Sequence, residues 1–170
     1  MKAPLGLRIL AIIEILYGAL VTILQSLQLS GQLGIPQSVC TGFGGCTPFV
    51  VTVPYLLFII VFIGLPPLLG GILLFFRKQW GWWLSGGYLI YLSLSELTIL
   101  VRSLVTGAQG WEISAIYILL ILCILLYLFS NKVREAVEVE AFELMKILGL
   151  IGLSVCILSS YEAIIRMSSI

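Results

Sequence analysis

Hydrophobic residues run along the chain in long blocks, and polar residues gather in the short segments between the blocks. Each block is close to the roughly 20 residues that a helix needs to cross a bilayer. The pattern predicts five membrane-spanning helices, at residues 7–29, 54–76, 84–105, 113–129 and 144–165. The expected fold class is therefore all-α, a polytopic transmembrane helix bundle that forms a single integral membrane domain over residues 1–170.

Composition supports the membrane interpretation and narrows the possible chemistry. Of the 170 residues, 61% are hydrophobic and 10% are charged, whereas about 25% of an ordinary soluble domain is charged. The net charge of +1 argues against a nucleic-acid partner. The chain has no His and no Asp, which removes the usual haem ligands, histidine zinc sites and Ser-His-Asp triads. We therefore expect no enzyme, no metal site, no cofactor, and the lipid bilayer as a partner.

The basic residues are unevenly distributed between the two sides of the predicted spans. Arg102 and Arg166 fall on one side, and the other Lys and Arg residues fall on the opposite side. Because positive residues are retained in the cytoplasm, we expect a multi-pass protein of the cell (plasma) membrane with its N-terminus inside and its C-terminus outside. The expected interfacial anchors are Arg77, Lys78, Trp80, Trp82 and Trp83 on the cytoplasmic face and Trp111 on the external face.

One cytoplasmic connector, residues 130–143, is the only strongly charged stretch of the chain. On a helix, its residues Val133, Val137 and Ala141 lie along one side, while most charges lie elsewhere. This pattern predicts a short amphipathic helix that lies at the membrane interface or against a partner.

The predicted external loop, residues 30–53, contains Cys40 and Cys46 with only small or turn-forming residues and one Phe between them. The outer face of a membrane is generally oxidising, so we expect these two cysteines to form a disulfide that closes a glycine-rich turn. A metal site would need more ligands than two thiolates, and thiol exchange usually relies on a closer Cys-x-x-Cys pair.

The candidate intramembrane polar residues are Glu14 in the first predicted span and Glu96 and Arg102 in the third. Intramembrane charges mark ion paths, or they fix helix packing from the bundle interior. We favour packing and keep a proton or cation path as the alternative. Pro66 and Pro67 lie inside the second span and predict a kink or a break there.

A stripe of small residues recurs at about four-residue spacing in the fifth span. Its members are Gly149, Gly152, Cys156, Ser160 and Ala163. Small residues on one helix face allow a second helix to approach closely. The stripe predicts either packing within the chain's own bundle or a face for another subunit.

Three segments resemble a group of small, uncharacterised prokaryotic membrane proteins that is common in archaea. They are the opening "APLGLRILAIIEILYGAL", the central "GILLFFRKQWGWWLS" and the later "ILLYLFSNKVREAVEVEAF". The resemblance covers about residues 3–142 and implies a four-helix membrane core without catalytic residues to carry over. The fifth span and the loop with Cys40 and Cys46 depart from the family pattern.

These observations favour a non-catalytic accessory subunit of a larger membrane complex, for which a respiratory assembly of the terminal-oxidase type is one candidate host. The alternative is a small transporter or channel that uses Glu14 and Glu96. The third hypothesis is a thiol–disulfide redox protein in which Cys40 and Cys46 cycle.

Overall fold

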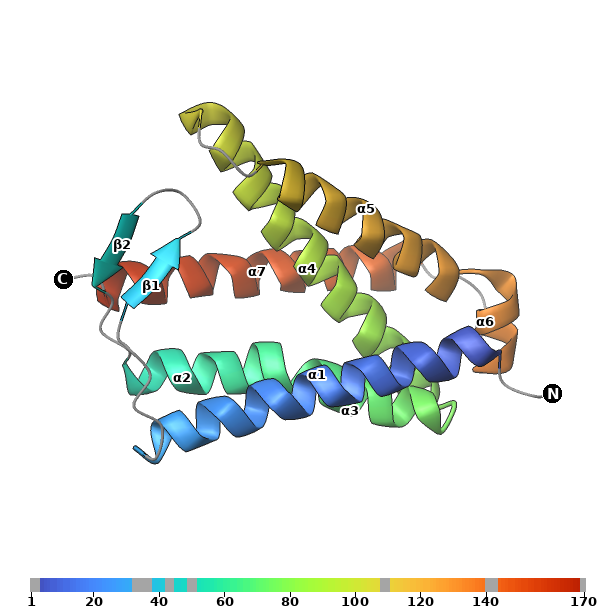
Figure 1. Cartoon of the computed structure of the whole chain (residues 1–170). Coiled ribbons are helices and arrows are strands. Elements are labelled where there is room, and N and C mark those ends of the chain that lie inside the picture. The colour runs from blue at the N-terminus through green and yellow to red at the C-terminus, as the bar shows by residue number, and fades with distance from the viewer. Residues whose placement is uncertain are drawn as a thin grey trace.

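The computed structural model describes the backbone at residues 4–31, 38–41, 45–48, 52–107, 111–139 and 144–168, and the side chains in these ranges except at 38–41, 45–48, 144–148, 162 and 164–168. The elements, in chain order, are α1 (Leu5–Leu29), β1 (Ser38–Thr41), β2 (Gly45–Pro48), α2 (Val53–Ile59), the π-helical turn η1 (Ile60–Gly64), α3 (Leu65–Phe75), α4 (Gln79–Thr106), α5 (Trp111–Leu128), α6 (Asn131–Ala136) and α7 (Leu144–Ser168) (Figure 1). The helical class is confirmed, with one short hairpin added to it.

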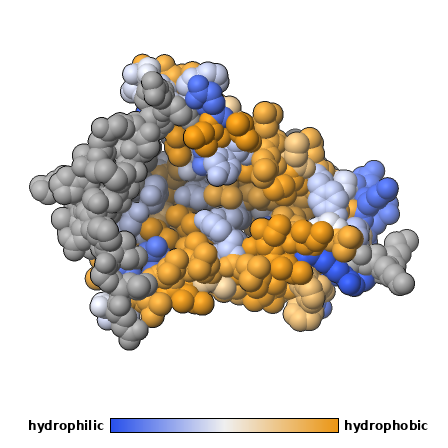
Figure 2. Space-filling model, viewed as in Figure 1, coloured by the Kyte–Doolittle hydropathy of each residue, from blue (hydrophilic) through white to orange (hydrophobic). Residues whose placement is uncertain are grey.

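Within the described residues, four helical segments are long and apolar enough to span a membrane, which marks the chain as a membrane protein. They are α1, the continuous segment Val53–Phe75, α4 and α5. The described part of α7 includes a shorter apolar stretch, Gly149–Tyr161. Figure 2 shows apolar residues over much of one face of the molecule, with hydrophilic residues at the end where α6 lies and again near the tip where α4 leads into α5. The first four predicted spans are therefore confirmed as apolar helices, and the fifth crossing stays a prediction.

The helices form a bundle in which α1 and α3 are in close contact and α4 contacts three of the other helices. α4 packs against α3, α5 and α7, and α2 also touches α7. α1 begins near α6, whereas the hairpin and the end of α7 lie at the opposite end of the bundle (Figure 1). The core lies where α1, α3, α4, α5 and α6 meet, and it includes Leu7, Leu74, Trp82, Leu128 and Val133.

The proline pair does not break the second span. Pro66 and Pro67 lack the N–H groups that an α-helix would use at these positions. The preceding residues form the π-helical turn η1, in which the N–H of Leu65 donates to the carbonyl of Ile60. The wider turn adjusts the backbone hydrogen bonds just before the prolines, where N–H donors are missing. As a result, α2, η1 and α3 follow one another as one apolar segment.

α4 begins five residues earlier than the sequence predicts. Arg77 adopts a left-handed backbone with φ of 55°, which ends α3, and the extended Lys78 precedes the first turn of α4. The tryptophans expected in a connector therefore lie on the first turns of a helix. Trp80 is exposed, but Trp82 is 1% exposed and lies in the core. The prediction that Trp82 is an interfacial anchor is therefore wrong.

The charged connector packs inward in the part that the structure describes. α6 is shorter than the predicted amphipathic helix, and Val133 and Val137 belong to the main core. Val137 donates its N–H to the carbonyl of Val133, and Glu138 then turns the chain with a positive φ of 56°. For these residues, the apolar side contacts the chain's own bundle.

The predicted external loop contains the antiparallel hairpin of β1 and β2, in which Cys40 is directly opposite Cys46. The side chains of both cysteines, and hence the predicted disulfide, lie outside the described residues. Among the cysteines that are described with side chains, Cys123 and Cys156 are free thiols.

Candidate functional site

A buried carboxyl group lies where α1, α3 and α4 meet. Glu14 on α1 is 5% exposed, and the hydroxyl of Ser85 on α4 donates a hydrogen bond of 2.5 Å to its Oε2. Gly70 on α3 makes room for the pair, because a Cβ atom there would lie 2.9 Å from Ser85 Oγ and 3.6 Å from Glu14 Oε2. Glu14 therefore ties three helices together, as the packing interpretation predicts.

One buried polar atom of this contact, Oε1 of Glu14, has no hydrogen-bond partner among the described residues. Tyr88, which lies one turn beyond Ser85 on α4, is also buried. The ring of Tyr88 is 6.4 Å from that of Tyr17 and 6.4 Å from that of Tyr91, measured between centroids. A buried polar group without a partner costs about 1–3 kcal/mol, so the unpaired Oε1 of Glu14 lowers the stability of this contact.

The other two predicted intramembrane charges do not join this site. Glu96 is partly exposed and lies eleven residues beyond Ser85 on α4, roughly 16 Å along the helix at 1.5 Å per residue. Arg102 is exposed and lies further still towards the end of α4. The two glutamates are therefore separate, and a shared ion path through direct contact between them is not present in the described part of the chain.

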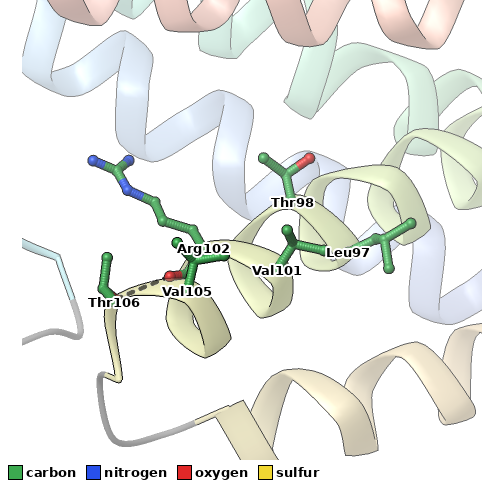
Figure 3. A pocket seen from close by; sticks show the side chains of 6 residues that line it. All are labelled: Leu97, Thr98, Val101, Arg102, Val105 and Thr106. Atoms are coloured by element: carbon green, nitrogen blue, oxygen red, sulfur yellow. Dashed lines mark hydrogen bonds between the residues drawn. The ribbon is translucent and has the colours of Figure 1, made fainter.

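Arg102 lines a surface pocket of about 450 Å³ on the last turns of α4. Figure 3 shows Thr98 and Arg102 on the same side of the helix, as the helical spacing predicts. The hydroxyl of Thr98 donates to the carbonyl of Leu94, and that of Thr106 donates to the carbonyl of Arg102. α4 is roughly 42 Å long at 1.5 Å per residue, and Arg102 lies within two turns of its C-terminal end. Near the ends of membrane-spanning helices, long basic side chains reach the lipid headgroups.

The small-residue stripe of α7 faces outward. Its five members are all exposed: Gly149, Gly152, Cys156, Ser160 and Ala163. A Cβ atom added at Gly149 or Gly152 would have no described atom within 4 Å. The opposite side of α7 is the one that packs, since Ser154 is 3% exposed. Among the described residues, the stripe therefore makes no close contact with the chain's own bundle at its two glycines.

Sequence reasoning missed Ser85 and Tyr88, which complete the surroundings of Glu14. A signal was available for Ser85, because Ser85, Gly86 and Gly87 form a run of small residues of the kind found at close helix contacts. Nothing comparable distinguishes Tyr88 from the other tyrosines of the chain.

Replacing Ser85 with alanine should destabilise the purified chain by about 1–3 kcal/mol, because both oxygens of Glu14 would then be buried without a partner. Thermal unfolding in detergent measures the effect. Ser103→Ala is the matched control, since Ser103 is equally buried but donates to Ile99 of its own helix. Adding Glu14→Met to Ser85→Ala should restore stability, because no buried polar group then remains at the contact. An unchanged melting temperature in Ser85→Ala would contradict the assigned contact.

No group of three or more potential metal ligands occurs among the described residues. The comparisons with known proteins add no homologue from which a function could be transferred: no family model, no curated protein and no solved structure matches the chain.

Proposed function

We propose that the chain is a non-catalytic accessory subunit of a larger protein complex in the plasma membrane. The observation that carries the proposal is the exposed small-residue stripe of α7. The stripe combines two glycines with no described neighbour at their Cβ positions and three further small residues. A respiratory assembly of the terminal-oxidase type is one candidate host.

The physical argument rests on how helices associate in lipid. Lipid chains are as apolar as leucine, so small residues promote association by letting two helix backbones approach closely. The same chain already uses this device between α1 and the continuous segment of η1 and α3. A Cβ atom at Gly18 would lie 2.7 Å from the carbonyl oxygen of Gly64, and one at Gly71 would lie 2.7 Å from that of Ala11. The stripe of α7 is likewise made of small residues, but among the described residues no helix lies against its two glycines.

The proposed topology has five crossings, with the N-terminus in the cytoplasm and the end of α7 outside. It is supported by the opposite positions of the start of α1 and the end of α7 in Figure 1. It is also supported by the basic residues of the α3–α4 turn and of α6, which include Arg77, Lys78 and Lys132. In this topology the stripe of α7 lies within the membrane, where a partner helix would meet it.

Photocrosslinking in native membranes tests the proposed face. We expect p-benzoylphenylalanine in place of Cys156 to crosslink the chain to a different polypeptide, because Cys156 lies on the stripe. The same group in place of Cys123 is the matched control, since Cys123 is also an exposed, free cysteine but lies on α5. Equal crosslinking at both positions, or a product made only of two copies of this chain, would contradict the proposal.

A second candidate function, a small transporter or channel, is favoured by one observation, namely the unpartnered Oε1 of the buried Glu14. Purified chain in lipid vesicles would then carry a proton or cation current that Glu14→Gln abolishes, with Glu96→Gln tested beside it. The accessory-subunit proposal predicts no flux in wild-type vesicles. A current that is lost in Glu14→Gln would favour the transporter.

A further inference from the structure

We propose that a row of five tyrosines connects the buried carboxyl group of Glu14 to the water at the hairpin end of the bundle, where β1 and β2 lie. Glu14 then exchanges protons with the water at that end and not with the water at the α6 end. The inference goes beyond the role of accessory subunit and does not depend on it. It also differs from the transporter candidate, because a path that stops at Glu14 carries no flux across the membrane.

Five of the seven tyrosines of the chain come together from four helices. Tyr88 and Tyr91, on α4, are each 6% exposed, and their ring centroids are 6.4 Å apart. The ring of Tyr17 on α1 is likewise 6.4 Å from that of Tyr88. Near the hairpin end, the ring of Tyr55 on α2 is 6.1 Å from that of Tyr161 on α7.

The hydroxyl groups of the row follow one another outward from the buried carboxyl group. That of Tyr88 interacts electrostatically with the carboxyl group and with Tyr17. That of Tyr91 interacts in the same way with Tyr17 and with Tyr161, and Tyr55 forms a side-chain hydrogen bond with Tyr161. Tyr55 and Tyr161 are partly exposed near the ends of their helices. The row therefore leads from the bundle interior to its surface.

The chemistry of the row suits proton transfer better than packing alone. A buried hydroxyl lowers stability unless it is hydrogen-bonded, so phenylalanine would serve a packing role equally well. A tyrosine hydroxyl both donates and accepts. Each oxygen can thus accept one proton and release the proton that it held, and its charge is the same before and after. At the inner end, Ser85 occupies Oε2 of Glu14, and Oε1 is the oxygen left to exchange the proton.

The path stops at Glu14 because the residues between it and the α6 end are apolar. Leu7 and Leu10 lie within two turns before Glu14 on α1, and Leu74 lies near the end of α3; all three belong to the main core. The indole N–H of Trp82 in this layer already donates to a backbone carbonyl. α3 itself contains no titratable residue. This layer offers no continuous chain of hydroxyl groups among its described residues.

Infrared spectroscopy of the full chain in lipid vesicles tests the path, because the C=O band of a protonated carboxyl group shifts when deuterium replaces its proton. The band of Glu14 is the one that Glu14→Gln removes. After transfer into D₂O, we expect this band to shift in the wild type. Tyr91→Phe removes one hydroxyl from the middle of the row and should slow the shift about tenfold, as expected for one lost hydrogen bond.

Tyr127→Phe is the matched control, because Tyr127 is partly exposed on α5 near the α6 end. It should leave the rate of the shift unchanged. Tyr161→Phe, at the partly exposed end of the row, should slow the shift as Tyr91→Phe does and guards against misfolding of the buried variant. The proposal would be overturned if Glu14→Gln removed no band, if the wild-type band did not shift, if wild type and Tyr91→Phe shifted at equal rates, or if Tyr127→Phe slowed the shift.

Discussion

Replacing Gly18 with leucine is expected to force α1 and α3 apart and to lower the melting temperature of the purified chain by roughly 10 °C, which corresponds to about 3 kcal/mol. A Cβ atom at this position would collide with the backbone of α3 at the N atom and Cα of Leu68, and with the carbonyl oxygen of Gly64 at the end of η1. Backbone atoms of a packed helix cannot move aside in the way that the end of a flexible side chain can. Circular dichroism during heating in detergent measures the change.

Gly152→Leu is the matched control for this substitution. Gly152 also lies on a long apolar helix, but a Cβ atom there would have no described atom within 4 Å. The melting temperature of the purified chain should therefore remain within a few degrees of the wild type. Equal melting temperatures for wild type and Gly18→Leu would show that α1 and α3 are not in close contact.

Replacing Trp82 with alanine is expected to destabilise the chain by about 3–5 kcal/mol, as for other large aromatic residues in a core. The indole of Trp82 donates a hydrogen bond of 2.8 Å to the carbonyl of Leu128 at the end of α5. Its ring also meets Trp83 and Phe129 edge-on, with 4.8 Å between centroids in both pairs. The substitution would therefore leave a cavity and an unpaired carbonyl together.

Trp80→Ala controls for the loss of a tryptophan near the same end of α4. Trp80 is 76% exposed, so its removal should change the melting temperature of the purified chain little. Trp82→Phe should fall between the two, because it keeps a ring in the core but loses the N–H donor. A larger loss in Trp80→Ala than in Trp82→Ala would contradict the assignment of Trp82 to the core.

The apolar blocks of the sequence predict the first four spans well because bilayer thickness sets their length independently of their neighbours. Predicted and observed bounds differ most for α4, which begins at Gln79 and not at residue 84. Hydropathy cannot place that boundary, since the tryptophans suit both a membrane interface and the first turns of a helix. The end of α3 is also hard to predict, because the residue with the left-handed backbone there is Arg77. A glycine or asparagine at this position would have indicated such a turn.

The partners of the polar residues are less predictable than the spans. Glu14 is expected inside the bundle because intramembrane carboxyl groups avoid lipid, and it is buried there. Its partner, Ser85, is 71 residues away in sequence, and no local pattern connects the two. The helix spacing likewise identifies the stripe of α7 but not its direction, since the same residues suit the chain's own bundle and a separate subunit equally well.

The central claim, that the stripe of α7 is the contact face for another subunit, is tested most directly by native mass spectrometry of the chain extracted from its own membranes in a mild detergent. The account predicts that the wild-type chain is released together with a different polypeptide. It also predicts that Gly152→Leu is released alone, although its melting temperature is unchanged. A wild-type chain that is released only as a lone monomer, under conditions that preserve other membrane complexes, would contradict the claim.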